Sequence, residues 1–190
     1  MYADNTLTPR EAIRLCALGT LAESSTSNET AITYDDLARS IRHFISRITG
    51  PSIDLMGESI ELLRFEGLIE AKDNTNPSNP TLEITKEGTK LLQELLLTNI
   101  RPGSGDLNEL IIALKFRFLH HISPNQQLSQ IDLMLEVYES ELLRNEDLCN
   151  YHKHDKGYFI GWLKNNIARL EIRNNWLKTF KRNITEKHQL

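Results

Sequence analysis

Apolar residues recur at helical spacing in two neighbouring stretches of the first half of the chain. In the first they are Leu37, Ile41, Phe44, Ile45 and Ile48, and in the second they are Ile53, Met56, Ile60 and Leu63. Steps of three and four place such residues on one face of a helix, which then packs on a core. Gly50-Pro51 interrupts the pattern, because a proline pushes the residue before it out of the helical region. The pattern predicts helices over 33–46 and 52–66, joined by a tight turn.

The period changes to two after the second helix. Apolar and polar residues alternate in 81–85, a second short segment lies at 68–72, and the polar loop 73–80 separates them. Alternation predicts a half-buried strand, and a loop rich in proline and asparagine predicts a hairpin tip. Helix, turn, helix and hairpin in this order predict a winged helix-turn-helix, a motif whose second helix typically enters the major groove of DNA.

Residues that favour helix ends support these boundaries. Thr8 is placed to cap an opening helix over 7–24, and Thr33 is placed to cap the helix that follows it. Gly67 fits a C-cap, where a left-handed residue is needed. Thr85 predicts that a further helix begins directly after the second strand.

The second half of the chain is helical by pattern. We expect helices over 107–122, from Ser123 onward, and over 155–184. The loop 99–106 contains one proline and two glycines, which makes it the best boundary candidate. We therefore expect a DNA-binding domain over residues 1–100 and a helical dimerisation or effector domain over residues 101–190. The predicted fold class is mostly α with a small β-wing.

The predicted second domain carries more apolar surface than one chain covers. In the helix after Ser123, apolar residues step by three and four, as in a coiled-coil seam. The last helix would be about 45 Å long at 1.5 Å per residue, which overshoots a domain of this size. We therefore expect its apolar stripe to extend onto a second chain. The predicted dimer-interface residues are Leu128, Ile131, Leu135, Tyr138, Leu142, Phe159, Trp162, Leu163 and Trp176.

The composition of the chain limits where the protein can work and what it can bind. No apolar run approaches the roughly 20 residues that span a bilayer, and we expect no secretory signal and no membrane contact. With only Cys16 and Cys149, we expect a reduced, cytoplasmic protein. The formal charge is −4 in all, with −5 over residues 1–104, −4 over 105–154 and +5 over 155–190. An acidic average does not favour non-specific nucleic-acid binding, but it allows a local basic footprint on a dimer.

The sequence contains no pattern that predicts catalysis or a cofactor. It lacks a P-loop, a dinucleotide loop, a nucleophile elbow and paired catalytic carboxylates, so we expect no enzyme. Neither His120-His121 nor the segment 152–154 has metal-ligand spacing, so we expect no metal site. Trp162 and Trp176 leave two interpretations open, an interface or the lining of a pocket for a small-molecule effector.

Four stretches resemble the PadR family of bacterial transcriptional regulators, in particular its AphA-like branch. They are LCALGTLAE (15–23), TYDDL (33–37), ELLRFEGLIE (61–70) and LEITKEGTKLL (82–92), with Thr33 where the family has glycine. The resemblance covers about the first half of the chain. It implies a homodimeric repressor or activator that binds promoter DNA through two winged helix-turn-helix domains. It also implies that the C-terminal helices supply most of the dimer contact.

The sequence departs from the family pattern on the recognition helix. Asp54, Glu58 and Glu61 lie on its predicted exposed face, and Gly57 stands where many members have tyrosine. Carboxylates near DNA phosphates are repelled. We therefore expect a DNA-binding regulator and keep one alternative from another class, a winged-helix protein-interaction or effector-sensing module that has lost DNA binding.

If DNA is bound, two groups of residues should hold it. The predicted DNA-binding residues are Tyr34, Arg39, Arg42, Ser52, Ser59, Arg64, Lys72 and Lys86. Ser52, Ser59 and Arg64 flank the core stripe of the recognition helix and should face the groove. Arg39, Arg42 and Lys86 lie on elements that border the groove and should contact phosphates.

Overall fold

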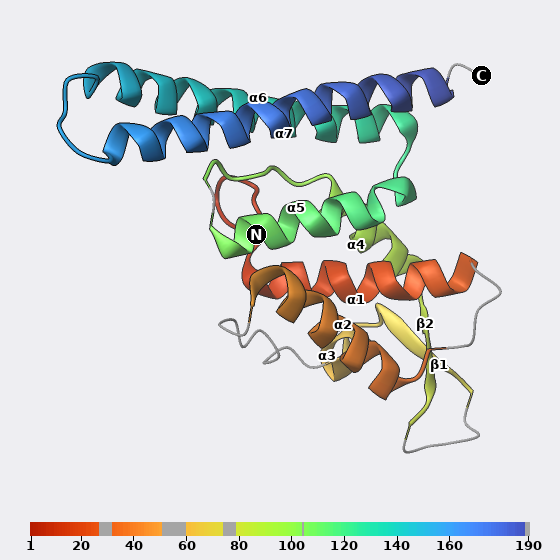
Figure 1. Ribbon diagram of the computed structural model, residues 1–190. Coiled ribbons are helices and arrows are strands. Elements are labelled where there is room, and N and C mark those ends of the chain that lie inside the picture. The colour runs from red at the N-terminus through yellow and green to blue at the C-terminus, as the bar shows by residue number, and fades with distance from the viewer. Residues whose placement is uncertain (27–31, 51–59, 74–78, 104, 189–190) are drawn as a thin grey trace. The chain divides into compact units, whose positions relative to one another are not determined.

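The described residues are mostly helical and also form a small two-stranded antiparallel sheet, as the pattern predicts (Figure 1). The computed structural model describes residues 1–26, 32–50, 60–73, 79–103 and 105–188. The chain divides into two units, one of residues 1–99 and 104–122, the other of residues 100–103 and 123–190. Each unit is described by itself.

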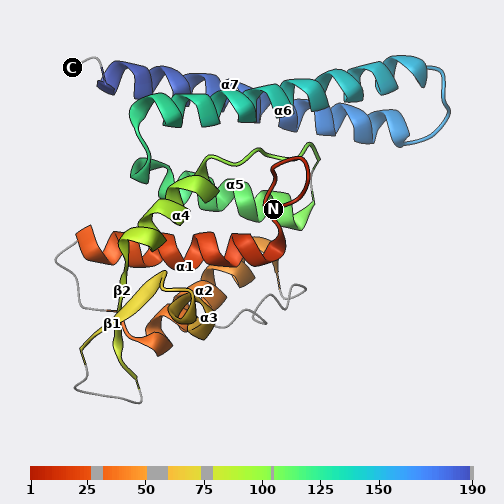
Figure 2. The same ribbon diagram turned by 180° about the vertical axis from the view of Figure 1, so that it is seen from behind.

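The first unit is built around helix α1. Its elements are α1 (Pro9–Thr26), α2 (Tyr34–Thr49), α3 (Ile60–Phe65), β1 (Ile69–Asp73), β2 (Thr81–Ile84), α4 (Lys86–Leu96), α5 (Asp106–Phe118) and the 3₁₀ turn Leu119–His121. α1 packs against α2, α4, α5 and β2, as Figures 1 and 2 show from opposite sides. Its residues from Leu15 to Thr20 are all buried. An opening helix that is apolar on several sides therefore forms the centre of this core.

The predicted helix caps are confirmed. At α1 the Glu11 backbone N–H donates to Thr8 Oγ1 at 3.3 Å, while the Thr8 N–H donates to the Glu11 carboxylate at 2.9 Å, which completes a capping box. At α2 the Asp36 N–H donates to Thr33 Oγ1 at 3.3 Å. These bonds satisfy backbone donors that a helix start leaves without partners.

Gly67 ends α3 as predicted. Its φ is +71°, a conformation that glycine adopts without steric cost. The Gly67 N–H donates to the Arg64 carbonyl at 3.0 Å, and the Leu68 N–H donates to the Leu63 carbonyl at 2.9 Å. This pair of bonds is a Schellman motif, and the burial of Leu63 and Leu68 supplies its usual apolar contact. The direction of the chain from α3 into the hairpin is thereby fixed.

A short segment that precedes α2 forms backbone hydrogen bonds with the β1–β2 hairpin. β1 and β2 pair with Ile69 opposite Ile84 and Glu70 opposite Glu83. On the other side of β2, the Leu82 N–H donates to the Ile32 carbonyl at 2.8 Å, and the Tyr34 N–H donates to the Pro80 carbonyl at 3.2 Å. The start of α2 is therefore attached directly to the hairpin, a contact that the sequence pattern does not reveal.

α5 belongs to the first unit, where it packs against α1 and α2. The division of the chain therefore falls after residue 122, whereas the sequence placed it at 100. Lys115 of α5 is fully buried, and its Nζ donates to the carbonyls of Leu96 and Thr98 at 2.7 Å each. These carbonyls lie at the end of α4, where a helix leaves acceptors without partners. Burial lowers the pKa of Lys115 to about 7.

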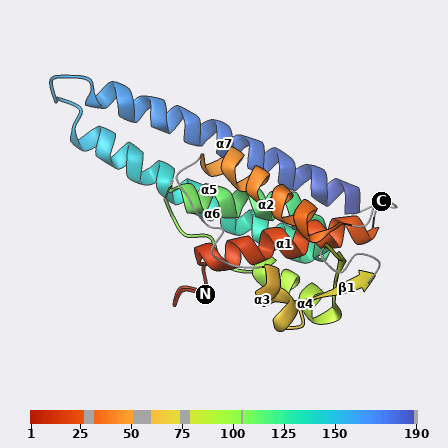
Figure 3. The same cartoon turned by 90° about the horizontal axis from the view of Figure 1, so that it is seen from below.

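The second unit contains two long helices that run side by side in opposite directions, α6 (Pro124–Tyr151) and α7 (Phe159–His188) (Figures 1 and 3). Ion pairs link them, among them Lys178–Glu139 at 2.8 Å and Lys181–Asp132 at 2.5 Å. Arg173 donates to the Tyr138 hydroxyl at 3.0 Å. The hairpin of helices thus aligns the start of α6 with the end of α7.

Two details of the sequence prediction are wrong. The last helix begins at Phe159 rather than near residue 155, because Gly157 at φ +129° and the turn bond from the Asp155 N–H to the His152 carbonyl keep that segment out of a helix. Ile48 is exposed, although it was predicted to be buried on α2. The buried residue that follows Ile45 on this helix is Thr49, four positions later, and not Ile48. Within the described residues, no helix is both long and apolar enough to cross a membrane.

Candidate nucleic-acid interface

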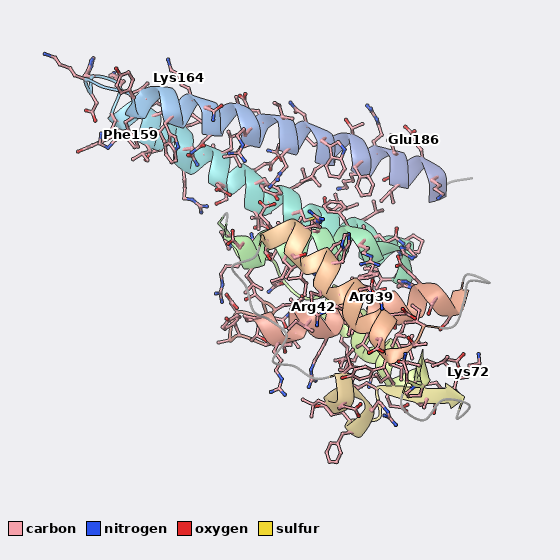
Figure 4. The ribbon with its side chains drawn as sticks, turned by 60° about the horizontal axis from the view of Figure 1, so that its bottom comes forward. Arg39, Arg42, Lys72, Phe159, Lys164 and Glu186 are labelled. Atoms are coloured by element: carbon pink, nitrogen blue, oxygen red, sulfur yellow. The ribbon has the colours of Figure 1, made fainter. Side chains whose placement is uncertain are left out.

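The outward face of α2 carries two of the predicted phosphate contacts. Arg39 and Arg42 are exposed and lie one turn apart on this helix (Figure 4). Arg39 pairs with Asp36 at 3.3 Å on the same face, whereas Arg42 forms no ion pair within the described part of the chain. Tyr34 is half-buried at the first position of α2, where its backbone is tied to the hairpin. Arg42 is therefore the better placed of the two arginines to meet an external anion.

Of the predicted recognition helix, residues 52–66, the structure describes α3 and the residues that follow it. Arg64, the predicted base-reading residue, pairs with Glu61 at 3.4 Å across one helical turn. Phe65 is 90% exposed, an unusual position for an aromatic residue. The predicted site residues do not include Phe65, although its place off the Ile60–Leu63 stripe could have indicated its exposure. Ser52 and Ser59 lie outside the described residues, as do Asp54 and Glu58.

The remaining predicted DNA-binding residues are cations on the β1–β2 hairpin and on α4. Lys72 on β1 forms an ion pair with Glu83 on β2, and Figure 4 places it at the hairpin. Lys86 is the first residue of α4 and is exposed. Among the residues that the structure describes, Lys86 has no carboxylate partner. In the described part of the chain, Arg42 and Lys86 thus carry positive charge that is not paired with a carboxylate.

Thr85 and Gly88 hold these elements together. The Thr85 hydroxyl donates to the Gly67 carbonyl at 2.8 Å and accepts from the Gly88 N–H at 3.0 Å. A Cβ on Gly88 would lie 2.0 Å from the Leu68 carbonyl oxygen, closer than any side chain permits. The end of the recognition helix and the start of α4 can therefore meet only where residue 88 is glycine, which fixes the hairpin relative to α3.

The charge pattern of this surface is mixed. Arg39, Arg64 and Lys72 each face a carboxylate within reach of an ion pair. Exposed ion pairs of this kind contribute about 0–1 kcal/mol, so a phosphate can displace the carboxylate at little cost. The released carboxylate then stays near the phosphate and repels it. The arrangement can bind a polyanion through a few cations, and it limits how tightly it does so.

Comparison with known families decides the class. Residues 2–181 match the family model described as "Putative AphA-like transcriptional regulator". The chain belongs to this AphA-like family. The match spans both units and is not confined to the helix-turn-helix region. A comparison with curated proteins finds no match.

The predicted dimer contacts of this AphA-like chain fall into two groups. Ile131, Tyr138 and Leu163 are already buried within a single chain, and Leu128, Leu135 and Leu142 are half-buried. Trp162 and Trp176 remain 57% and 51% exposed, and Phe159 is also exposed. The apolar seam of α6 is therefore largely covered within a single chain, and the accessible aromatic residues among the predicted contacts lie on α7. Among the described residues, no His, Cys, Asp and Glu side chains gather into a group of three that could hold a metal ion.

Proposed function

We propose that this AphA-like regulator binds promoter DNA as a homodimer through a winged helix-turn-helix formed by α2, the recognition helix that ends in α3, and the β1–β2 hairpin. The family match over residues 2–181 carries the proposal, because it extends over the elements that would contact DNA and those that would pair two chains. A DNA-binding role implies that the protein works in the bacterial cytoplasm.

The local geometry supports contact with the DNA backbone. Arg39 and Arg42 project from α2, the helix that borders the groove in this motif, and Lys86 begins the helix after the hairpin. Cations on elements that flank a recognition helix position the protein through phosphates, whereas the recognition helix itself reads bases. In this arrangement Arg42 and Lys86 grip phosphates first, and Arg39 joins them when Asp36 is displaced.

A second candidate function rests on the ion pairs themselves. Each of Arg39, Arg64 and Lys72 is offset by its own carboxylate, which is what a surface without a polyanionic partner would favour. On this alternative the winged domain is a protein-interaction or effector-sensing module. The two candidates differ in what removal of a carboxylate does, since only a DNA-binding surface gains affinity for DNA when the competing charge is lost.

Selection of bound fragments from a random-sequence DNA pool by the full-length chain tests the proposal. Duplexes recovered in this way are then titrated by fluorescence anisotropy at several salt concentrations. Arg42 and Lys86 from two chains should release about four counterions, so the slope of log K against log salt should be near −4, at about −0.9 per phosphate contact. Recovery of no enriched sequence, together with a slope near zero on every duplex, would refute DNA binding and favour the interaction module.

Homodimerisation is tested separately by sedimentation of the full-length chain. A dimer is expected at micromolar concentration, whereas a monomer at all concentrations would contradict that part of the proposal.

A further inference from the structure

Phe65 points away from the core more directly than any other residue of α3. Its side chain is 90% exposed, whereas Ile60 and Leu63 on the same helix are buried. At about 3.6 residues per turn, Phe65 lies about 170° around the helix from the midpoint of Ile60 and Leu63. A recognition helix packs on the core with one face and presents the opposite face to the major groove. Phe65 lies at the centre of that opposite face.

The backbone on both sides of Phe65 is held in place. The Leu68 N–H donates to the Leu63 carbonyl at 2.9 Å as part of the Schellman motif that ends α3. The Glu66 carboxylate, next in the chain, accepts a hydrogen bond from Arg14 of α1 at 2.7 Å. The exposure of Phe65 is therefore not the result of a frayed helix end, because the first unit fixes the position from which the ring projects.

The charged neighbours of Phe65 on the exposed side of α3 offset each other. Glu61 lies one turn before Phe65 and Arg64 one residue before it, and the two side chains form an ion pair at 3.4 Å. Arg64 leaves the helix on its flank, about 70° from the midpoint of the core stripe. A surface built only for phosphates would place its cations outermost, whereas α3 places an aromatic ring there. The outermost position of α3 therefore suits an apolar partner.

The major groove of DNA presents one prominent apolar group, the C5-methyl group of thymine. The other groups by which base edges are distinguished there are hydrogen-bond donors and acceptors. A phenyl ring placed over one of them removes water without replacing its hydrogen bonds, which costs free energy. Contact with a thymine methyl group instead removes two apolar surfaces from water together. Thymine is therefore the base that an outermost phenylalanine favours.

We propose that Phe65 is a specificity-determining residue, whose ring packs against the C5-methyl group of a thymine in the major groove, near the base that Arg64 contacts. This inference rests on the DNA-binding function proposed above and adds a preferred base to it. It also accounts for an aromatic ring that a fixed backbone presents to water, because bound DNA covers the ring. Each chain of the proposed homodimer has one Phe65, so each half-site should contain such a thymine.

Replacement of thymine with uracil tests the contact at the level of one methyl group. The duplexes recovered by the selection described above are synthesised with each thymine in turn replaced by uracil, which keeps the base pair and all its hydrogen-bonding groups. Binding of the full-length chain is measured by fluorescence anisotropy. At one position of each half-site the replacement should weaken binding about fourfold, the effect of one methyl-sized group no longer buried, and about sixteenfold when both half-sites are changed.

Substitutions at Phe65 identify the residue that makes the contact. Phe65→Ala should bind the thymine and uracil duplexes equally, whereas Phe65→Leu keeps an apolar side chain and should retain part of the preference. Alanine favours a helix and the ring is 90% exposed, so Phe65→Ala should unfold at the same temperature as the wild type. Tyr158→Ala is the matched control, because it removes a 96% exposed aromatic side chain from the second unit and should keep the full preference for thymine.

5-Methylcytosine provides an independent measurement of the same contact. Replacing the sensitive T·A pair with C·G removes the methyl group and also changes the hydrogen-bonding groups of the pair. The further change from cytosine to 5-methylcytosine restores the methyl group alone. This second change should increase the affinity of the wild type about fourfold for each half-site and should leave the affinity of Phe65→Ala unchanged.

Three results would overturn the inference. If bound duplexes tolerate uracil at every thymine, Phe65 does not recognise a methyl group, although DNA binding itself stands. If Phe65→Ala keeps the preference for thymine, another residue makes the contact. If the full-length chain binds no DNA, the proposed function and this inference fail together.

Discussion

Replacing Lys115 with methionine should change the stability of the protein in opposite directions at neutral and alkaline pH. The methionine side chain has a similar length and no charge, so it fills the same buried position. It also removes the two N–H donors that reach the Leu96 and Thr98 carbonyls at the end of α4. The free energy of unfolding therefore changes through lost hydrogen bonds and through lost burial of a titratable amine.

At alkaline pH the hydrogen bonds decide the sign. A neutral amine donates two N–H groups, which is enough for both carbonyls. A buried acceptor that loses its partner costs roughly 1–3 kcal/mol. Lys115→Met should therefore lower the free energy of unfolding by about 2–4 kcal/mol near pH 10, where wild-type Lys115 is neutral in the folded protein.

At neutral pH the titration of the amine opposes this loss. The pKa of Lys115 is lowered to about 7 in the folded protein by burial, from an ordinary value of 10.5. Between these values the unfolded chain binds more protons than the folded one, so wild-type stability rises with pH. At about 1.4 kcal/mol per pH unit, this window amounts to roughly 5 kcal/mol. The variant lacks the group, so near pH 7 it should be as stable as the wild type or more stable.

Urea denaturation followed by circular dichroism at pH 6 to 10 measures the difference. The stability of the wild type minus that of Lys115→Met should increase steadily from pH 7 and approach about 1.4 kcal/mol per pH unit, because all other titrating groups cancel. A flat difference for Lys115→Met would mean that the two carbonyls hold a charged ammonium, and the argument from burial would be wrong.

The remaining predictions concern the surface and the caps. Arg42→Ala should weaken binding to every DNA alike and flatten the salt slope by about two units per dimer, since each phosphate contact contributes about one; anisotropy titrations measure both. Asp36→Asn should free Arg39 and tighten DNA binding several-fold, whereas an unchanged affinity would indicate that Arg39 takes no part. Thr85→Ala should lower the free energy of unfolding by about 0.5–2 kcal/mol, as for other N-caps, measured by thermal denaturation. Cys149 should react with a thiol reagent in the folded protein, while Cys16, whose pKa is raised to about 12 by burial, should react only on unfolding.

Local chemistry made much of the fold predictable. Thr8, Thr33 and Thr85 cap helices because a hydroxyl next to a free helix end satisfies backbone donors whatever the rest of the chain does. Gly67 ends α3 for an equally local reason, its φ of +71°. Such features depend on a few neighbouring residues, so the sequence contains all the information that they need.

Contacts between distant segments were not predictable in the same way. The attachment of residues 32–34 to β2 is made by backbone groups, which every residue type shares. α5 joins the first unit because it packs against α1 and α2, and its apolar pattern fits any core equally well. Lys115 is buried because the end of α4 offers it two carbonyls, a partner that periodicity cannot reveal. The pattern correctly predicts that the loop 99–106 separates two helices, but it does not reveal that both helices, α4 and α5, belong to the first unit.

The residues of the candidate interface also fall into two groups, those with a role that the sequence motif predicts and those with a role that depends on their partners in the fold. Thr85 and Gly88 lie in one of the four stretches that resemble the family, and they act on folding, because the cap and the missing Cβ allow the hairpin to meet α4. Any winged domain of this geometry needs them, whatever its surface binds. Affinity for DNA instead depends on Arg39, Arg64 and Lys72, whose carboxylate partners the motif does not specify. Membership of the AphA-like family therefore sets the frame of the domain. How tightly this chain holds DNA depends on whether phosphates displace those carboxylates, and the change at Asp36 measures that competition directly.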